Sequence, residues 1–219
     1  MKKFILSSLA VLIVFFSRAQ IKKGQVVLGG SLGFGHSAST YDSSYHQSDT
    51  KFTSFNISPS VGWAIKDNLL FGVEATYTHQ RSSTEQSTVN THSDFNSFTG
   101  GVFIRKYKYL GSGFSFFAQG NADLTYGHTK YVNTNPGNQN QDSYGFAMGF
   151  YPGVAFALSS RWQLETGFPN VGYINYNHSK YTAETPAGKD QHYSNNSFSV
   201  GSSLSNTYQL SIGLKYIIG

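Results

Sequence analysis

The stretch SYGFAMGFYPGVAFAL, residues 143–158, alternates bulky apolar residues with small ones over the length of one long strand. Every second residue from Tyr144 to Leu158 is bulky, whereas the residues between them are mostly Gly, Ala and Ser. Because successive side chains of a strand point to opposite faces, the two sets meet two different environments. The stretch therefore predicts a strand with one apolar face and one nearly bare face.

The same alternation recurs along the chain and predicts eight strands. They cover residues 26–35, 54–65, 71–78, 98–105, 115–127, 143–158, 162–168 and 207–218. Pro59 and Pro152 fall inside two of them, and since proline removes a donor from the ladder, we expect a local bulge at each. Around Pro169 and Asn170 the alternation becomes ambiguous. We expect an irregularity in the seventh strand there.

The connections between these strands alternate in length. Residues 66–68, 108–113 and 159–161 predict tight turns, and residues 37–50, 82–94, 129–142 and 179–196 predict long polar loops. An up-and-down meander with its long loops at one end has this rhythm. In bacterial outer-membrane barrels the short turns face the periplasm and the long loops face outward. The sequence therefore predicts an all-β fold, an eight-stranded antiparallel up-and-down transmembrane β-barrel.

The N-terminus has the pattern of a secretory signal peptide. Lys2 and Lys3 precede an apolar run from Phe4 to Phe16, and the small residues around Arg18 suit a cleavage site. We expect a signal peptide over residues 1–19, which is cleaved, and a barrel domain over residues 20–219; the alternative is a retained anchor. Without the leader the net charge falls from +5 to +2, so the chain gives no reason to expect a nucleic-acid partner. There is no cysteine, which excludes disulfides and a lipid-anchored N-terminus.

A soluble lipocalin-like barrel or a β-sandwich would also alternate, but with its bulky residues inside. Its surface would then consist mainly of Gly, Ser, Ala and Thr, with few charges, because only 12% of this chain is charged. The surface of a soluble protein is richer in Lys and Glu. The narrow lumen of an eight-stranded barrel suits the small set better, so we assign the bulky set to lipid. Aromatic residues gather near both ends of the predicted strands, where interfacial girdles lie. They are Trp63, Phe71, Phe116, Phe156, Trp162 and Tyr216 at the short-turn end, and Phe34, Tyr77, Phe98, Tyr126, Tyr144 and Phe198 at the other.

The chain resembles the small eight-stranded outer-membrane β-barrel family, the OmpA-transmembrane-domain-like and OmpX-like proteins of Gram-negative bacteria. The resemblance covers Gly24 to Gly219 and rests on the strand pattern and on segments such as residues 103–107, Phe-Ile-Arg-Lys-Tyr, which run into Phe116 and Phe117. It implies a location in the cell outer membrane and contact with outer-membrane lipid, lipopolysaccharide and the barrel-assembly machinery. That machinery reads a terminal aromatic residue in the family, whereas this chain ends in Gly219.

Several polar residues fall on the face assigned to the lumen. They are Glu74, Arg105, Gln119, Asp123, Glu165 and Lys215. We expect them to form a structural polar network, with Glu74, Arg105 and Asp123 converging from neighbouring strands, because buried charges are normally paired. The alternative is a path for protons or ions.

No residue pattern points to catalysis, a metal or a cofactor, and we expect none of the three. Seven histidines fall at strand ends or in the expected loops without the tight spacing of metal ligands: His36, His46, His79, His92, His128, His178 and His192. The His-x-Ser spacing of His46 to Ser48 resembles a lipid A deacylase site, but such residues are common in polar loops. We therefore expect a structural or surface-interaction role through long extracellular loops that meet a surface ligand. The alternative is a narrow channel or transporter for small solutes or ions.

Overall fold

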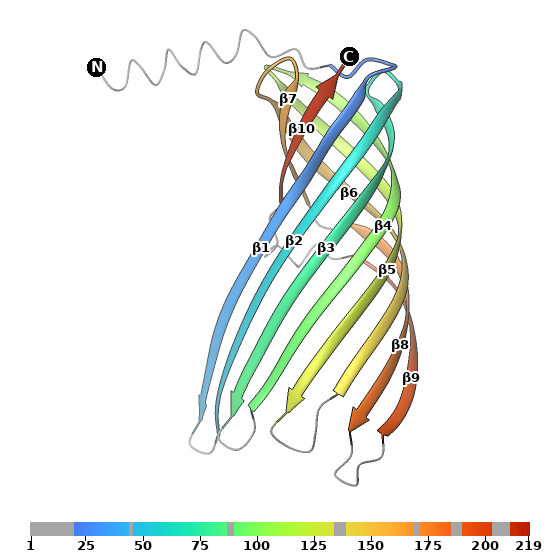
Figure 1. Ribbon diagram of the computed structural model, residues 1–219. Coiled ribbons are helices and arrows are strands. Elements are labelled where there is room, and N and C mark those ends of the chain that lie inside the picture. Colours follow the sequence, from blue (N-terminus) through green and yellow to red (C-terminus); the bar gives the residue numbers. More distant parts are fainter. Residues whose placement is uncertain are drawn as a thin grey trace, which may run out of the picture.

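The computed structural model describes residues 20–43, 46–86, 90–133, 139–168, 171–184, 190–202 and 211–219, which form ten strands (Figure 1). The expected signal peptide, residues 1–19, and Pro169 and Asn170 lie outside the described residues. No described residue belongs to a helix long and apolar enough to cross a membrane. The strands are β1 (Val26–Ser43), β2 (His46–Lys66), β3 (Leu69–Gln86), β4 (Asn90–Gly111), β5 (Phe114–Asn133), β6 (Gln139–Ala157), β7 (Trp162–Gly167), β8 (Gly172–Glu184), β9 (Asp190–Gly201) and β10 (Ser211–Ile218).

The ten strands form an antiparallel ring of eight, because two of the eight are each divided into two elements. β7 and β8 both pair with β6 and together make the seventh strand. β9 pairs with β8 and β10 pairs with β7, so these two make the eighth strand. β10 also pairs with β1 over eight residues, from Val26 to Gly33, and so closes the ring. The predicted eight-stranded up-and-down barrel is confirmed.

One end of the barrel, the turn end, carries the tight connections and the last residue, Gly219 (Figure 1). Asn68 and Ser112 turn the chain there with positive φ angles of 58° and 51°. The other end, the hairpin end, carries the connections after β1, β3, β5 and β8. The expected turn over residues 108–113 is shorter than predicted, since β4 runs to Gly111.

The long loops expected at the hairpin end are wrong: the strands continue through most of these residues. β1 reaches Ser43, which pairs with His46, and the three other hairpins are extended in the same way. Bulky alternation marks only the part of a strand that faces lipid, about 9–11 residues, whereas Ser and Thr continue the ladder without that signal. Since β4 alone has 22 residues, the barrel extends well beyond its apolar band.

The expected irregularity in the seventh strand is confirmed. Gly153 pairs with Gly167 but Phe150 pairs with Gly172, so the register of the seventh strand on β6 differs by two residues between β7 and β8. The Pro152 carbonyl, between these two pairs, accepts a hydrogen bond of 2.9 Å from Phe168 N. The bulge expected at Pro152 itself is wrong, because its pairing with Ala118 of β5 continues in register.

The bulge expected at Pro59 is also wrong. The β2–β3 ladder omits the pairs at Ser58 and Pro59 and resumes in the same register at Ser60. A hydrogen bond of 2.9 Å from Thr76 Oγ1 to Ser58 Oγ joins the two strands at this gap. The register of this pair of strands shifts instead between Ala64 and Lys66, beside the turn.

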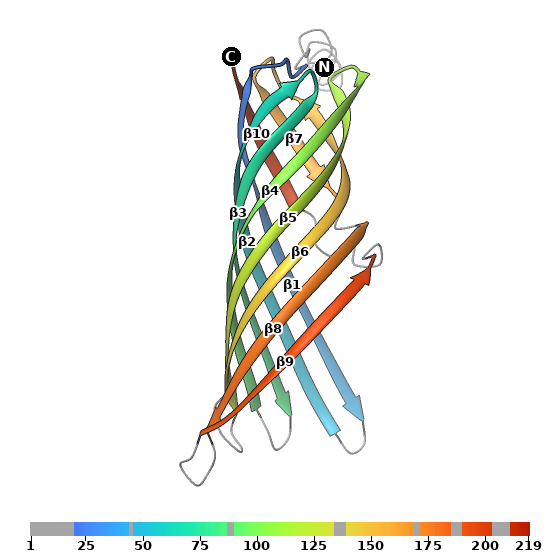
Figure 2. The same ribbon diagram turned by 90° about the vertical axis from the view of Figure 1, so that its right-hand side faces the viewer.

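The ring is less regular at the hairpin end, where β9 diverges from β1 (Figure 2). Within the described residues β1 has β10 as its neighbour on that side, and only as far as Gly33. The eighth strand, predicted over residues 207–218, is described over β10 and over β9, which lies mostly within a predicted loop.

The bulky set faces outward, as predicted, and the small set faces the lumen. Outward Phe34, Phe98 and Phe198 are 68%, 61% and 69% exposed. Inward Ala155 and Ala157 from the opening stretch are buried. An apolar outer wall of this kind fits the hydrocarbon core of a bilayer.

Candidate functional site: the plugged lumen

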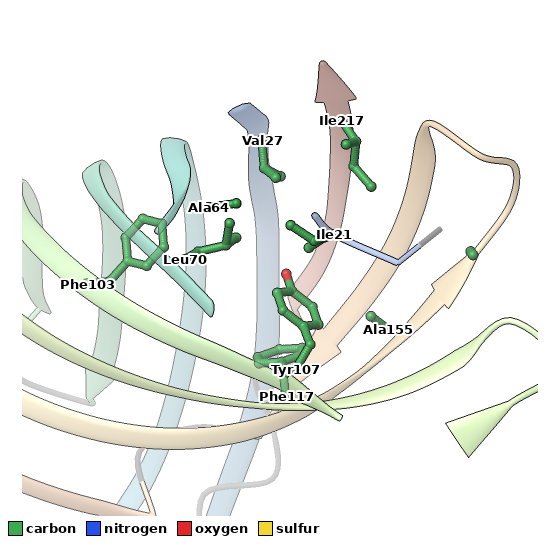
Figure 3. Close-up of a cluster of buried hydrophobic side chains, with 10 residues drawn as sticks. Ile21, Val27, Ala64, Leu70, Phe103, Tyr107, Phe117, Ala155 and Ile217 are labelled. Carbon is green, nitrogen blue, oxygen red and sulfur yellow. The ribbon is translucent and has the colours of Figure 1, made fainter. Parts of the chain in front are cut away.

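An apolar layer fills the lumen at the turn end. Val27, Leu70, Tyr107 and Ile217 point inward from four strands and are at most 4% exposed. Ile21, from the segment before β1, lies among them (Figure 3). Its carbonyl accepts a hydrogen bond of 2.9 Å from Asn68 N, which fixes the segment to a turn. The first described residues of the chain therefore close this mouth of the barrel.

Arg105, on the inward face of β4, is the centre of a buried polar cluster. Its Nε donates to Gln119 Oε1 at 2.6 Å, and its Nη1 donates to Glu165 Oε2 at 2.6 Å. The second bond is also an ion pair, in which the two side chains are 4% and 7% exposed. The guanidinium thus reaches across the lumen from β4 to β7.

Two tyrosines complete the hydrogen bonding of this guanidinium. Nη1 lies 3.1 Å from the hydroxyl of Tyr107, and Nη2 lies 3.4 Å from that of Tyr151. Its carbon atom also lies 4.5 Å from the ring centroid of Phe117, which is within range of a cation–π contact. Arg105 is therefore held on several sides by hydrogen bonds, opposite charge and an aromatic face.

Lys215 and Glu74 extend the cluster. Lys215 Nζ lies 3.3 Å from Glu165 Oε1 and donates to Ser60 Oγ at 2.8 Å. Gln119 Nε2 lies 3.3 Å from each carboxylate oxygen of Glu74. Two cationic and two anionic side chains thus share one layer of the lumen, which is the arrangement that a low-dielectric interior requires.

Asp123 lies in one row with Glu74, across Gly101 of β4, but within the described residues it forms no ion pair with Arg105. It accepts a hydrogen bond from Asn121 and lines a different cavity of the lumen, together with Thr125. Five of the six residues expected in the lumen network are thus brought together, and the acid that pairs with Arg105 is Glu165. Chain order favours pairing between neighbouring strands, but a narrow lumen also lets opposite walls meet.

Several residues of the cluster are absent from the sequence-based expectation, notably Tyr107, Phe117, Tyr151 and Ser60. A signal for one of them is present in the chain, because a large inward residue needs a bare position opposite. Gly153 pairs with Phe117, and a Cβ at Gly153 would collide with the Phe117 ring. Gly72 and Phe103 form a second pair of this kind.

On the hairpin side of the cluster lies a cavity of about 230 Å³. Ser54, Asn56 and Ser58 contribute to its wall, while Arg105 and Glu165 contribute to its floor. Arg105 and Glu165 are paired with each other, so the arrangement is a polar cavity on the hairpin side of a closed plug.

The histidines occupy strands. His36, His79, His128 and His178 lie on β1, β3, β5 and β8, with the parity of the outward residues, and His46 begins β2, where a loop was expected. Across the described ranges, no three His, Asp or Glu side chains gather in a way that could hold a metal ion.

Comparisons with known proteins bear on the fold. Neither the protein-family models nor the curated proteins contain a match. Among solved structures, the outer membrane protein OprG from Pseudomonas aeruginosa is similar with a TM-score of 0.51 and 11% identity, over 90% of this chain and 97% of that one. A major outer membrane protein from Thermus thermophilus has a TM-score of 0.49 and 10% identity over 88% and 99%. Neisserial surface protein A has a TM-score of 0.42 and 19% identity over 89% and 97%. The likeness to OprG shows that this chain has the fold of a small outer-membrane β-barrel.

Proposed function

We propose that the protein is an integral outer-membrane barrel with a side-chain-filled lumen, which acts through its protruding hairpins in a structural or surface-interaction role. The observation that carries the proposal is the two-layer plug. Ile21 and its neighbours close the turn end, and behind them the guanidinium of Arg105 spans the lumen to Glu165. A continuous water path would have to break this buried ion pair. A plug of this kind favours a role without transport.

The location is inferred from the outer wall and the fold. Outward aromatic residues flank an apolar band, and this arrangement suits a strand-built protein in a bilayer. The similarity in fold to OprG supports the outer membrane as the compartment. Export through a signal peptide over residues 1–19, cleaved before Gln20, would bring the chain there.

The protruding hairpins support an interaction role. They carry aromatic side chains beyond the apolar band: the rings of Tyr181 and Tyr193 stack with centroids 4.5 Å apart, and Tyr41 is 65% exposed. Aromatic residues among polar ones suit contacts to sugars or proteins. We propose a surface ligand at these hairpins, lipid and lipopolysaccharide around the wall, and the barrel-assembly machinery during biogenesis.

Planar-bilayer recordings test the plug. The purified, folded protein is expected to give no steady single-channel steps, because the ion pair and the apolar layer exclude a water column. An empty-micelle control sets the background. Reproducible steps of one size, which scale with salt concentration, would contradict the proposal and would favour a narrow channel for small solutes or ions.

A further inference from the structure

The hairpin end repeats one outward motif four times, once on each strand that runs toward this end. An aromatic residue is followed two positions later by a histidine, and both have outward parity. The four segments are Phe34-Gly35-His36 on β1, Tyr77-Thr78-His79 on β3, Tyr126-Gly127-His128 on β5 and Tyr176-Asn177-His178 on β8. The repeat marks a belt around the barrel at one depth.

Three of the four repeats share the same hydrogen bonds. In the first, the Tyr77 hydroxyl donates to Asn96 Oδ1 at 2.9 Å, and His79 Nδ1 lies 2.9 Å from the same oxygen. The oxygen belongs to the next strand, directly opposite the histidine. The other two sets, with distances of 2.8 to 3.1 Å, are Tyr126, His128 and Asp142, and Tyr176, His178 and Asn196.

These bonds orient the imidazoles. An amide oxygen accepts but does not donate, so His79 and His178 carry a proton on Nδ1. Nε2 is then the ring nitrogen left for an external group, as an acceptor when the ring is neutral and as a donor when it is charged. At β1 the ring is held in a different way, since His36 Nδ1 lies 3.2 Å from Thr53 Oγ1.

A cationic side chain lies one outward position further toward the hairpin end than each histidine or the residue that pairs with it. Lys51, Arg81, Lys130 and Lys180 occupy these positions on β2, β3, β5 and β8. Arg81 is paired with Asp94 at 2.8 Å, and this hydrogen bond holds the pKa of the Asp94 carboxyl below its usual range. Within the described ranges the three lysines form no ion pair, although Asp142, the partner of His128, lies directly opposite Lys180. The four cations outnumber the carboxylates of Asp94 and Asp142, so the belt keeps positive charge.

The depth of the belt follows from strand geometry. The aromatic tier marks the edge of the hydrocarbon. Each tier is two residues further along a strand, so in a tilted barrel the histidine and cation tiers lie roughly 5 and 10 Å beyond that edge. The polar headgroup layer has about this thickness on each side of a bilayer.

We propose that this hairpin-end belt, made of the four histidines and the four cations, binds the phosphate-bearing headgroups of the surrounding lipid leaflet. The proposal rests on the proposed membrane-spanning role. Lysines complement phosphate in charge and in hydrogen bonding, and an imidazole does so through Nε2 when its ring is charged. The aromatic tier next to them packs against the lipid near its glycerol or sugar part.

The lipid that the purified barrel retains tests the belt. The protein is folded in bilayers of phosphatidylcholine with one fifth phosphatidic acid, and native mass spectrometry counts the lipids retained by the released barrel. Each surface lysine changes partition toward anionic lipid by roughly fivefold. We expect enrichment of phosphatidic acid on the wild type and at least a fivefold lower enrichment on the triple variant Lys51→Gln, Lys130→Gln, Lys180→Gln.

A matched triple variant at the other end is the control. Lys66, Lys106 and Lys108 are exposed at the turn end, and their replacement by Gln removes the same charge without touching the belt. We expect this variant to lower the enrichment less than twofold. Equal losses in the two triple variants would overturn the proposal, as would no loss in either.

Two further measurements distinguish a lipid-binding belt from a folding defect and from a site for a soluble anion. A gel shift between unheated and boiled samples reports whether each variant folds in the bilayer, and a wild type without this shift would overturn the membrane-spanning role itself. Inorganic phosphate at roughly 10 mM is expected to leave the retained lipid unchanged, because one free ion contacts few of the belt's groups. Displacement by phosphate would assign the belt to a soluble anion and would overturn the lipid proposal.

For the histidines, we expect the triple variant His79→Gln, His128→Gln, His178→Gln to lose about half of the enrichment.

Discussion

Replacement of Arg105 by alanine is expected to lower the free energy of unfolding of the barrel by about 3–5 kcal/mol, the cost of breaking a buried ion pair by removing one partner. Glu165 would keep Lys215 as a counter-charge, but the bonds to Gln119, Tyr107 and Tyr151 would be lost, and a cavity would remain beside Phe117. Urea titration of the protein in lipid vesicles, followed by the gel shift between folded and unfolded forms, measures the change.

The control for this prediction is Arg81→Ala. Arg81 makes the same kind of bond to a carboxylate, at 2.8 Å, but its side chain is 59% exposed. Exposed ion pairs are screened by solvent and contribute little to stability, so this variant should differ little from the wild type. An Arg105→Ala barrel as stable as the Arg81→Ala barrel would show that the buried cluster does not stabilise the fold.

Replacement of Gly153 by valine is expected to cost about 3 kcal/mol, because the inward space at this position is filled. A Cβ there would collide with the Phe117 ring and would lie 2.6 Å from the carbonyl oxygen of Thr166. The backbone of β7 cannot give way without breaking its pairing with β6. The same urea titration reports the loss.

Gly100→Val is the matched control, since an added Cβ at Gly100 meets nothing within 4 Å and this residue has outward parity. We expect this variant to be as stable as the wild type or slightly more stable, because valine adds lipid-facing apolar surface. Equal losses at Gly100 and Gly153 would mean that the cost reflects the strand backbone and not the packing against Phe117.

The parity of the chain predicted the barrel because lipid imposes a strong rule on the outward face. In the stretch from Tyr144 to Leu158 the bulky residues had to alternate, and the same pattern recurs in the other strands. The number of strands and the face of each strand that meets the lumen could therefore be predicted. The protruding hairpins obey no such rule. At Thr50 or Ser82, for example, polar residues face water on both sides, and a strand there has the composition of a loop.

The lumen was predictable only in part. Inward charges such as Arg105 and Glu165 stood out on a face of small residues, but their pairing depends on the diameter of the barrel and on the stagger of its strands. The plug by Ile21 involves a segment without alternation. The belt does leave a signal in the sequence, since Tyr126 and His128 have counterparts at the same spacing on three other strands. That signal lies at the strand ends, where the bulky alternation stops, so the strand pattern alone does not reveal it.

The central claim, that the bulky set faces lipid and the small set faces a packed lumen, is tested most directly by single cysteines along β6. The chain contains no cysteine, so a probe can be attached at one position at a time. A bimane label at Phe146→Cys or Met148→Cys should be quenched strongly by brominated lipid, whereas a label at Ala147→Cys should be quenched weakly. Equal quenching at 146, 147 and 148, or stronger quenching at 147, would contradict the assignment of the two faces.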